Sequence, residues 1–375
     1  MAALLEKIKL LKGLLNGSTA YGGPFYVTID ITRRCNLHCL GCPYHSTEIS
    51  NVSPHKPGPT DLSTDLVKRL CGELKEIGTS SLVLQGEGEP LLHSDIIDLI
   101  LAAKTAGIRV TLLTNGTLLD QHLVREIIAA KLDILKVSLW ASSPDQYQQN
   151  YPETSSENFN RVLDGLRLMA KQKEEQKSSV PLVILHHPIN RNNYQTLDRM
   201  ADLALSTNCN GLTFAPMYSF RGILDSFTLS HDEKRLVYHS LSRIRKQLNT
   251  RSLTHNIEEV LLRYKIGVAV WEKLPCYIAW FHARIKVDGT VQPCSRCSLP
   301  LGNLNQNNFN EIWNGASFCH FRRQTLTRQG LESMSGHCDC SFCCFFGDNM
   351  RVHRFFKWFF PLRRHPNKEV SCWEG

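Results

Sequence analysis

The feature that most constrains this chain is an alternation of short apolar runs with longer amphipathic stretches between residues 25 and 215. The β-like apolar runs span residues 25–31, 81–84, 109–114, 134–139, 182–186 and 211–214. Helical periodicity marks segments 64–77, 95–106, 118–131, 156–171 and 193–206. Helices that separate such runs indicate repeated β-α-β units, with a parallel sheet and helices outside it. Six strands are too few for a closed eight-stranded barrel, so the sequence predicts an α/β fold, a partial (β/α)6 TIM-type barrel.

Functional side chains of such a sheet gather at the carboxyl ends of its strands. This rule directs attention to residues 33–42, 85–90 and 114–116, which follow the first three predicted strands. His187 and Arg221, near the ends of the last two, are candidate catalytic residues. A structural role is an equal alternative for either of them.

Fourteen cysteines need an explanation. No run approaches the roughly 18 apolar residues of a membrane span, and charges at Glu6, Lys7 and Lys9 interrupt any secretory signal. We therefore expect a cytoplasmic protein, in which clustered cysteines bind metal or react rather than form disulfides. Three cysteines fall within residues 35–42 and seven within 276–343.

The first group has the spacing Cys35-x3-Cys39-x2-Cys42 and directly follows the first predicted strand. Three thiolates suit a 4Fe–4S cluster, and the absence of a fourth nearby cysteine leaves one iron open to a small ligand. A closed zinc site completed by His38 or His45 is the alternative, but the spacing is not that of a zinc finger.

This cysteine signature at the end of a first strand resembles that of the radical SAM superfamily. The resemblance implies that the open iron binds S-adenosylmethionine, whose reductive cleavage gives a radical that removes a substrate hydrogen. The segment Gln85-Gly86-Glu87-Gly88-Glu89-Pro90 is similar to the family's Gly-Gly-Glu motif, which receives the methionyl amine. The cofactor-binding residues implied by the resemblance are Glu87, Gly88, Glu89, Asn115 and Ser138. One departure is Gly41, where the family often has an aromatic residue before the third cysteine.

The second cysteine group resembles the auxiliary-cluster module called SPASM, in its shorter twitch form. The resemblance rests on Cys276, twelve residues, Gly289, four residues and Cys294, followed after a long gap by Cys340-x2-Cys343. It implies that Cys276, Cys294, Cys340 and Cys343 hold a second 4Fe–4S cluster. The alternates for this ligand set are Cys297, Cys338 and Cys344. A zinc ribbon built from the pairs Cys294/Cys297 and Cys340/Cys343 is the other interpretation, and it leaves Cys276 unexplained.

These patterns divide the chain into five segments. They are an amphipathic N-terminal helix (1–24), the partial barrel (25–225), a helical connector (226–270), the auxiliary-cluster module (271–346) and a basic aromatic tail (347–375). The termini could contact a membrane surface, and the tail could bind nucleic acid by stacking and charge. Packing of both ends over the barrel as caps is the alternative.

The resemblance implies a radical SAM enzyme with two 4Fe–4S clusters, S-adenosylmethionine and an electron donor such as flavodoxin or ferredoxin. We expect oxidation or epimerisation of a small polar metabolite, such as a sugar or aminocyclitol. One alternative is a maturase that acts on a ribosomally made peptide. The alternative outside enzymes is a metal-containing nucleic-acid-binding protein.

Overall fold

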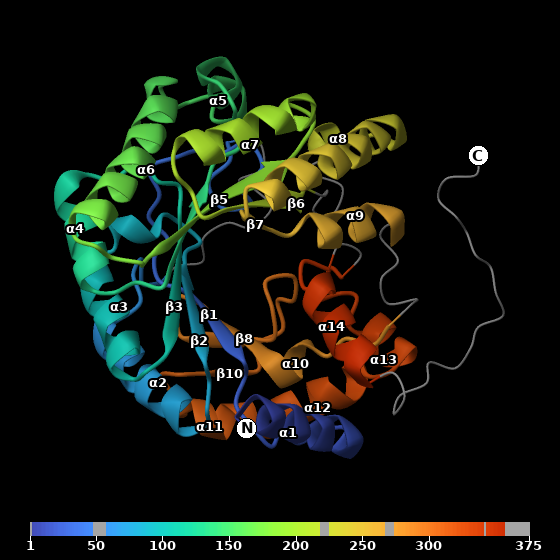
Figure 1. Cartoon of the computed structure of the whole chain (residues 1–375). Coiled ribbons are helices and arrows are strands. Elements are labelled where there is room, and N and C mark those ends of the chain that lie inside the picture. The colour runs from blue at the N-terminus through green and yellow to red at the C-terminus, as the bar shows by residue number, and fades with distance from the viewer. Residues whose placement is uncertain (1, 48–57, 218–224, 267–273, 341–342, 357–375) are drawn as a thin grey trace.

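A ten-stranded sheet organises the described part of the chain and curves without closing (Figure 1). The computed structural model describes residues 2–47, 58–217, 225–266, 274–340 and 343–356. The strand order is β10-β9-β8-β1-β2-β3-β4-β5-β6-β7, and each neighbouring pair from β8 to β7 is parallel. Because the edge strands β10 and β7 do not pair, the sheet is an open, partial barrel, as the sequence predicts.

The six predicted strands and five predicted helices are present, with ends displaced by a few residues at most. The strands are β1 (Tyr26–Asp30), β2 (Ser81–Gln85), β3 (Arg109–Thr114), β4 (Ile134–Ser138), β5 (Leu182–Ile189) and β6 (Gly211–Pro216). The helices are α2 (Thr64–Glu76), α3 (Ile96–Thr105), α4 (Gln121–Ala129), α6 (Glu157–Glu175) and α7 (Leu197–Ser206). The sequence analysis missed α5 (Pro144–Asn150), a short helix after β4 that is capped by the Ser143 side chain.

The two faces of the strands carry different side chains, apolar on the face covered by helices and partly polar on the face inside the barrel. Val27, Leu82 and Val110 lie side by side on β1, β2 and β3, and each is 0% exposed. These side chains form the core beneath the outer helices, whose apolar stripes cover them. On the opposite face of the sheet, polar side chains such as Lys136 and Arg284 line internal cavities.

Two further strands extend the parallel arc beyond the sequence prediction. The segment after β6 forms α8 (His231–Thr250), β7 (Thr254–His255) and α9 (Ile257–Ile266), and β7 pairs with β6. At the other edge, β8 (His282–Ile285) pairs with β1, and β9 (Thr290–Gln292) and β10 (Gly302–Asn303) continue the sheet in antiparallel fashion. The cysteine-rich segment therefore shares the sheet of the barrel.

Helices complete the C-terminal segment and one end of the molecule. They are α10 (Ile278–Phe281), α11 (Phe309–Trp313), α12 (Ala316–Thr325), α13 (Arg328–Ser333) and α14 (Phe346–Phe356). The N-terminal helix α1 (Ala2–Asn16) packs against α10, which in turn packs against α12 (Figure 1). Buried Arg322 joins these parts, because its guanidinium donates to the carbonyls of Ser18, Ala279 and Trp313.

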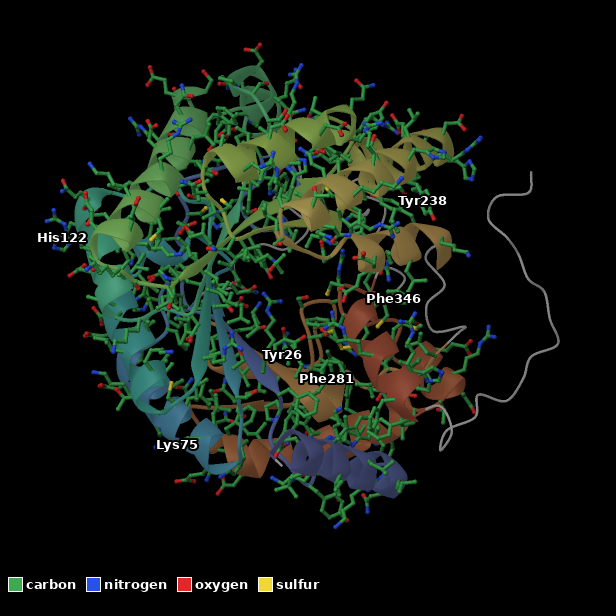
Figure 2. All side chains as sticks on the ribbon, in the orientation of Figure 1. Tyr26, Lys75, His122, Tyr238, Phe281 and Phe346 are labelled. Atoms are coloured by element: carbon green, nitrogen blue, oxygen red, sulfur yellow. A yellow bond between two sulfur atoms is a disulfide. The ribbon has the colours of Figure 1, made fainter. Side chains whose placement is uncertain are left out.

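Aromatic contacts fasten the barrel to the C-terminal segment. The ring of Tyr26 on β1 lies 6.4 Å from that of Phe281, and the two side chains lie close together in Figure 2. The Tyr26 hydroxyl donates to Asp348 at the start of α14 (2.8 Å). Among the described residues, we find no helix long and apolar enough to cross a bilayer. Most of the predicted basic aromatic tail, from residue 357 onward, lies outside the described residues.

Candidate functional site

The first cysteine group lies on the loop after β1, at the carboxyl end of that strand. Cys35, Cys39 and Cys42 are free, partly buried thiols, and Cys42 N donates to Cys39 O (3.0 Å). Burial raises the pKa of Cys35 to about 11, and the Glu89 carboxylate and the Cys42 thiol raise it as well. The structure thus gathers the three predicted ligands at a place where bare thiolates are unfavourable without a cation such as iron.

The loop after β2 packs directly on this cysteine loop. Gly88 N donates to Thr32 O (3.0 Å), and Glu89 N donates to Arg34 O (2.7 Å). A Cβ atom at Gly88 would overlap the backbone of Arg34, so only glycine permits this approach. The predicted motif therefore fixes the backbone next to Cys35.

The carboxylate of Glu89 is 2% exposed and holds the end of β3. Its Oε1 accepts hydrogen bonds from Thr114 Oγ1 (2.6 Å) and Leu91 N (3.0 Å), and its Oε2 accepts one from Asn115 N (2.7 Å). A carboxylate offers about four acceptor sites. One site on Oε2 is left for a ligand donor such as an ammonium, and we expect the methionyl amine there.

The carboxylate of Glu87 has a different environment. Its Oε2 accepts from Arg33 Nε (3.2 Å), and its Oε1 pairs with Lys286, which follows β8. Burial opposes ionisation, but Lys286, Arg284 and Arg33 hold the pKa of Glu87 below its usual value. Glu87 therefore joins the barrel to the C-terminal segment through charge.

The next two predicted cofactor residues lie at strand ends as expected. Asn115 follows β3, and its Nδ2 donates to Asn36 Oδ1 on the cysteine loop (2.9 Å). Ser138 ends β4, and its Oγ accepts from Trp140 Nε1 (3.0 Å). Both polar groups border the first cysteine loop through these neighbours, and their role toward the cofactor remains a prediction.

Trp140 is a site residue that the sequence analysis missed. A Cβ atom at Gly41 would lie 3.1 Å from Trp140 Cζ3 and 2.8 Å from Met217 Cε. Residues that follow β4 and β6 therefore fill the space beside the cysteine loop, which explains why Gly41 has no side chain. The only signal in the sequence was this glycine at a position where the family often has an aromatic residue.

A cavity of about 310 Å³ opens beside Gly41 inside the barrel. Its lining residues are Gly41, Pro43, Tyr44, Gln85, Gly86, Pro216, Met217, Arg284, Ser295 and Arg296. Arg284 is fixed by buried Asp30, which accepts from Arg284 Nε (2.7 Å), and by the Tyr44 hydroxyl (3.2 Å). This cavity is bounded by the cysteine loop, the motif after β2 and the C-terminal segment, so a bound molecule would contact all three.

The second cysteine group surrounds a separate pocket in the C-terminal segment. Cys276, Cys294, Cys340 and Cys343 all line it as free thiols, together with Cys344. Burial raises the pKa of Cys276 to about 11 and that of Cys294 well above its usual value. Among the described residues, no three Cys, His, Asp or Glu side chains converge on one point as ligands of a single ion. The four predicted ligands line one pocket, which is where a cluster held by them would lie.

The alternates for this ligand set are now distinguished. The expectation that the clustered cysteines do not form disulfides is wrong for two of them, because Cys297 and Cys338 are joined by a disulfide, and both are buried. This bond removes Cys297 from the zinc-ribbon arrangement and both residues from the cluster ligands in this structure. Cys344 remains an alternate, because it is a free, exposed thiol that lies 3.2 Å from Ser295 Oγ.

The two predicted catalytic residues are placed differently. His187 is 0% exposed, and its Nδ1 lies 2.8 Å from Leu139 O, while burial lowers its pKa to about 4. Its neighbour His186 lines a cavity on the inner side of the sheet instead. Arg221 lies outside the described residues.

Comparison with known proteins identifies both cysteine regions. The sequence model of the radical SAM superfamily matches residues 29–204. The SPASM model, described as an iron–sulfur cluster-binding domain, matches residues 276–344. This chain belongs to the radical SAM superfamily. Its C-terminal segment is a SPASM domain, and its cofactors are 4Fe–4S clusters and S-adenosylmethionine. Free thiols grouped at both sites fit these cofactors.

Two curated proteins illustrate the similarity. The chain is 25% identical over 334 residues to an AdoMet-dependent heme synthase of Methanosarcina barkeri, across 86% of this chain and 90% of the relative. It is 35% identical over 144 residues to a GTP 3′,8-cyclase of Limosilactobacillus fermentum, across 38% of this chain and 40% of the relative.

Solved structures confirm the radical SAM fold. Streptococcus suis SuiB bound to S-adenosylmethionine superposes with a TM-score of 0.64 at 15% identity, across 87% of this chain and 74% of SuiB. Native anSMEcpe with bound AdoMet superposes with a TM-score of 0.61 at 17% identity, across 90% of this chain and 97% of anSMEcpe. At these identities the similarity concerns the fold alone.

Proposed function

We propose that this radical SAM enzyme oxidises a C–H position of a small polar metabolite, with the SPASM cluster as electron acceptor. The observation that carries the proposal is the position of Arg296. This residue lines the barrel cavity, the adjoining chamber below β6 and the auxiliary cysteine pocket. The barrel cavity beside the first cysteine loop and the auxiliary cysteine pocket are therefore neighbours, and a substrate near Arg296 would lie between the two cysteine groups.

The chain's own residues have separate tasks in this proposal. Cys35, Cys39 and Cys42 would hold the first cluster, which together with S-adenosylmethionine would supply the radical chemistry that removes a substrate hydrogen. The contacts to S-adenosylmethionine come from Glu89, through its remaining acceptor site, and from the strand ends at Gly88, Asn115 and Ser138. A small protein such as flavodoxin or ferredoxin would donate the electron.

The auxiliary cysteines favour oxidation over epimerisation. Cys276, Cys294, Cys340 and Cys343 hold the cluster that would accept the second electron. An epimerase needs a hydrogen donor, and Cys344 is the alternate cysteine that lines the substrate region as a free thiol. The epimerase alternative therefore depends on Cys344.

Two relatives support a small-molecule substrate. The names AdoMet-dependent heme synthase and GTP 3′,8-cyclase both refer to a small molecule, heme or GTP. The first of these proteins aligns with 86% of this chain. The identity to the first is too low to transfer its substrate, so only the substrate's general class is proposed.

The test measures the transfer of deuterium from the unidentified substrate to 5′-deoxyadenosine. The reconstituted enzyme, a reductant and S-adenosylmethionine are incubated with extract from cells grown in heavy water. We expect deuterated 5′-deoxyadenosine from the dialysable small-molecule fraction. The Cys294→Ala variant should still form deuterated 5′-deoxyadenosine but should not form the oxidised product. The control variant Cys319→Ala should match the wild type, because the Cys319 thiol is not a predicted ligand and donates a hydrogen bond to Asn314 O. Oxidised product at the wild-type rate from Cys294→Ala would refute the electron-acceptor role.

Peptide modification is a second candidate. It is favoured by the fold of SuiB bound to precursor peptide SuiA, which superposes with a TM-score of 0.63 across 90% of this chain. In the same assay, deuterium transfer from a protease-sensitive fraction alone would establish a peptide substrate and refute the metabolite proposal.

A further inference from the structure

A second chamber adjoins the barrel cavity below β5 and β6. Its volume is about 270 Å³, and it shares Pro216 and Arg296 with the barrel cavity. Cys343 and Cys344 of the auxiliary pocket also line it. A substrate held in this chamber would lie between the two cysteine groups.

Lys136 on β4 brings a positive charge into this chamber. Lys136 lies two residues before the end of β4. Its partners in register are Leu113 of β3 and Ile184 of β5, so its neighbours across the sheet are apolar. Among the described residues, no carboxylate lies within ion-pairing distance of its ammonium group, and burial alone lowers its pKa to about 8. An ammonium withdrawn from water without a counter-ion is destabilising. An apolar side chain at this position would make the folded state more stable than a lysine does. We therefore infer that the ammonium group has a function, namely to bind a ligand.

The other charged groups of the chamber already have protein partners. Arg296 pairs with Asp339 (3.7 Å), and Glu259 pairs with Arg351 on α14. The guanidinium of Arg263 lies over the ring of Phe346, 5.4 Å from its centre, and Figure 2 shows Phe346 at the start of α14. Among the charged side chains that line this chamber in the described part of the chain, Lys136 is the one for which the structure gives no partner.

His186 adds a polar group beside this lysine. Its Nδ1 lies 3.0 Å from the Thr213 hydroxyl. Burial lowers its pKa well below the usual value, and the nearby Lys136 lowers it further. The ring is therefore neutral at physiological pH and adds no second positive charge.

We propose that Lys136 binds a carboxylate of the substrate in this chamber. The inference rests on the proposed function and narrows its substrate class to carboxylate-bearing metabolites. One unmatched positive charge fits a monoanion, and the three N–H donors of an ammonium fit the lone pairs of a carboxylate. A phosphate carrying two charges would leave one of them unmatched.

The test measures protection of Lys136 in the reconstituted holoenzyme and needs no turnover. The protein is acylated with a trace amount of an amine-reactive reagent. The acylation rate of each lysine is measured by mass spectrometry of the peptide that contains it. The probes are butyrate, its uncharged isostere butyramide, and inorganic phosphate. Lys246, an exposed lysine on α8, is the internal control.

Butyrate should slow acylation of Lys136 saturably, by about tenfold at ten times its Kd, and leave Lys246 unaffected. Butyramide should have no effect. Stronger protection by phosphate than by butyrate, equal protection by butyramide, or no protection by butyrate would each overturn the proposal. Failure of the proposed function would instead appear as a lack of deuterium transfer from the small-molecule fraction to 5′-deoxyadenosine, which this labelling does not measure.

Discussion

Glu89 allows a quantitative test of how the cofactor motif works. Glu89→Ala would leave the Thr114 hydroxyl and the N–H groups of Leu91 and Asn115 without their acceptor. An unsatisfied buried donor costs about 1–3 kcal/mol, so we expect the free energy of unfolding to fall by about 4 kcal/mol. This loss is a large part of the 5–15 kcal/mol that stabilises a typical domain.

Glu89→Gln separates the structural role of this carboxylate from its role in binding. The amide oxygen can still accept two of the three hydrogen bonds, so we expect a stability loss of about 2 kcal/mol. The acceptor site that we assign to the methionyl amine disappears, because an amide nitrogen replaces one oxygen. We therefore expect the Kd for S-adenosylmethionine to rise tenfold or more, on the order of 1.5–3 kcal/mol.

Two measurements distinguish these roles. Urea unfolding followed by circular dichroism gives the stability, and anaerobic equilibrium dialysis gives the Kd for S-adenosylmethionine. The matched control is Glu73→Gln, which weakens a remote hydrogen bond from Phe309 N (2.7 Å) and should leave the Kd unchanged. An unchanged stability in Glu89→Ala would contradict the bonding described above. An unchanged Kd in Glu89→Gln would remove Glu89 from the cofactor contacts.

Three further changes probe the cavities. Gly41→Phe should reduce S-adenosylmethionine cleavage strongly, because its Cβ already meets Met217 Cε at 2.8 Å; 5′-deoxyadenosine formed at the wild-type rate would contradict this. Asp30→Asn should lower the free energy of unfolding by about 3–5 kcal/mol by breaking its buried pair with Arg284, as chemical denaturation would show. The contribution of Lys136 to stability should become more favourable as pH rises from about 8 to 10.5, because Lys136 loses its proton near 8 when folded but near 10.5 when unfolded. The difference in urea midpoint between the wild type and Lys136→Met should therefore shift in favour of the wild type over this range, and a difference that does not change with pH would contradict the assigned environment.

The central strands, and the positions of the two cysteine groups in the fold, could be predicted from the sequence because their signals are local. Each strand is a short apolar run, and each cysteine group has a diagnostic spacing. Strands β7 and β8 could not be predicted in the same way, since each has only two to four residues and is defined by pairing with β6 and β1. Long-range pairing of this kind leaves little trace in local sequence.

The histidines show a different limit. β5 is almost continuously apolar, so its sequence does not reveal which alternate positions face inward. A shift of one residue moves a side chain to the other face of a sheet. The sequence analysis selected His187, whereas the structure places His186 at the chamber. Lys136 was overlooked for a different reason. A lysine within a strand usually indicates a solvent-exposed face, so it was not considered as a residue of an internal cavity.

The central claim is that two iron–sulfur clusters flank one substrate region, and iron analysis tests it most directly. After anaerobic reconstitution, the wild-type chain should bind about eight iron and eight sulfide, as two 4Fe–4S clusters. The triple variant Cys35→Ala, Cys39→Ala and Cys42→Ala should retain about half, and the double variant Cys276→Ala and Cys294→Ala should retain the other half. A wild-type chain that binds four or fewer irons together with stoichiometric zinc would contradict the account.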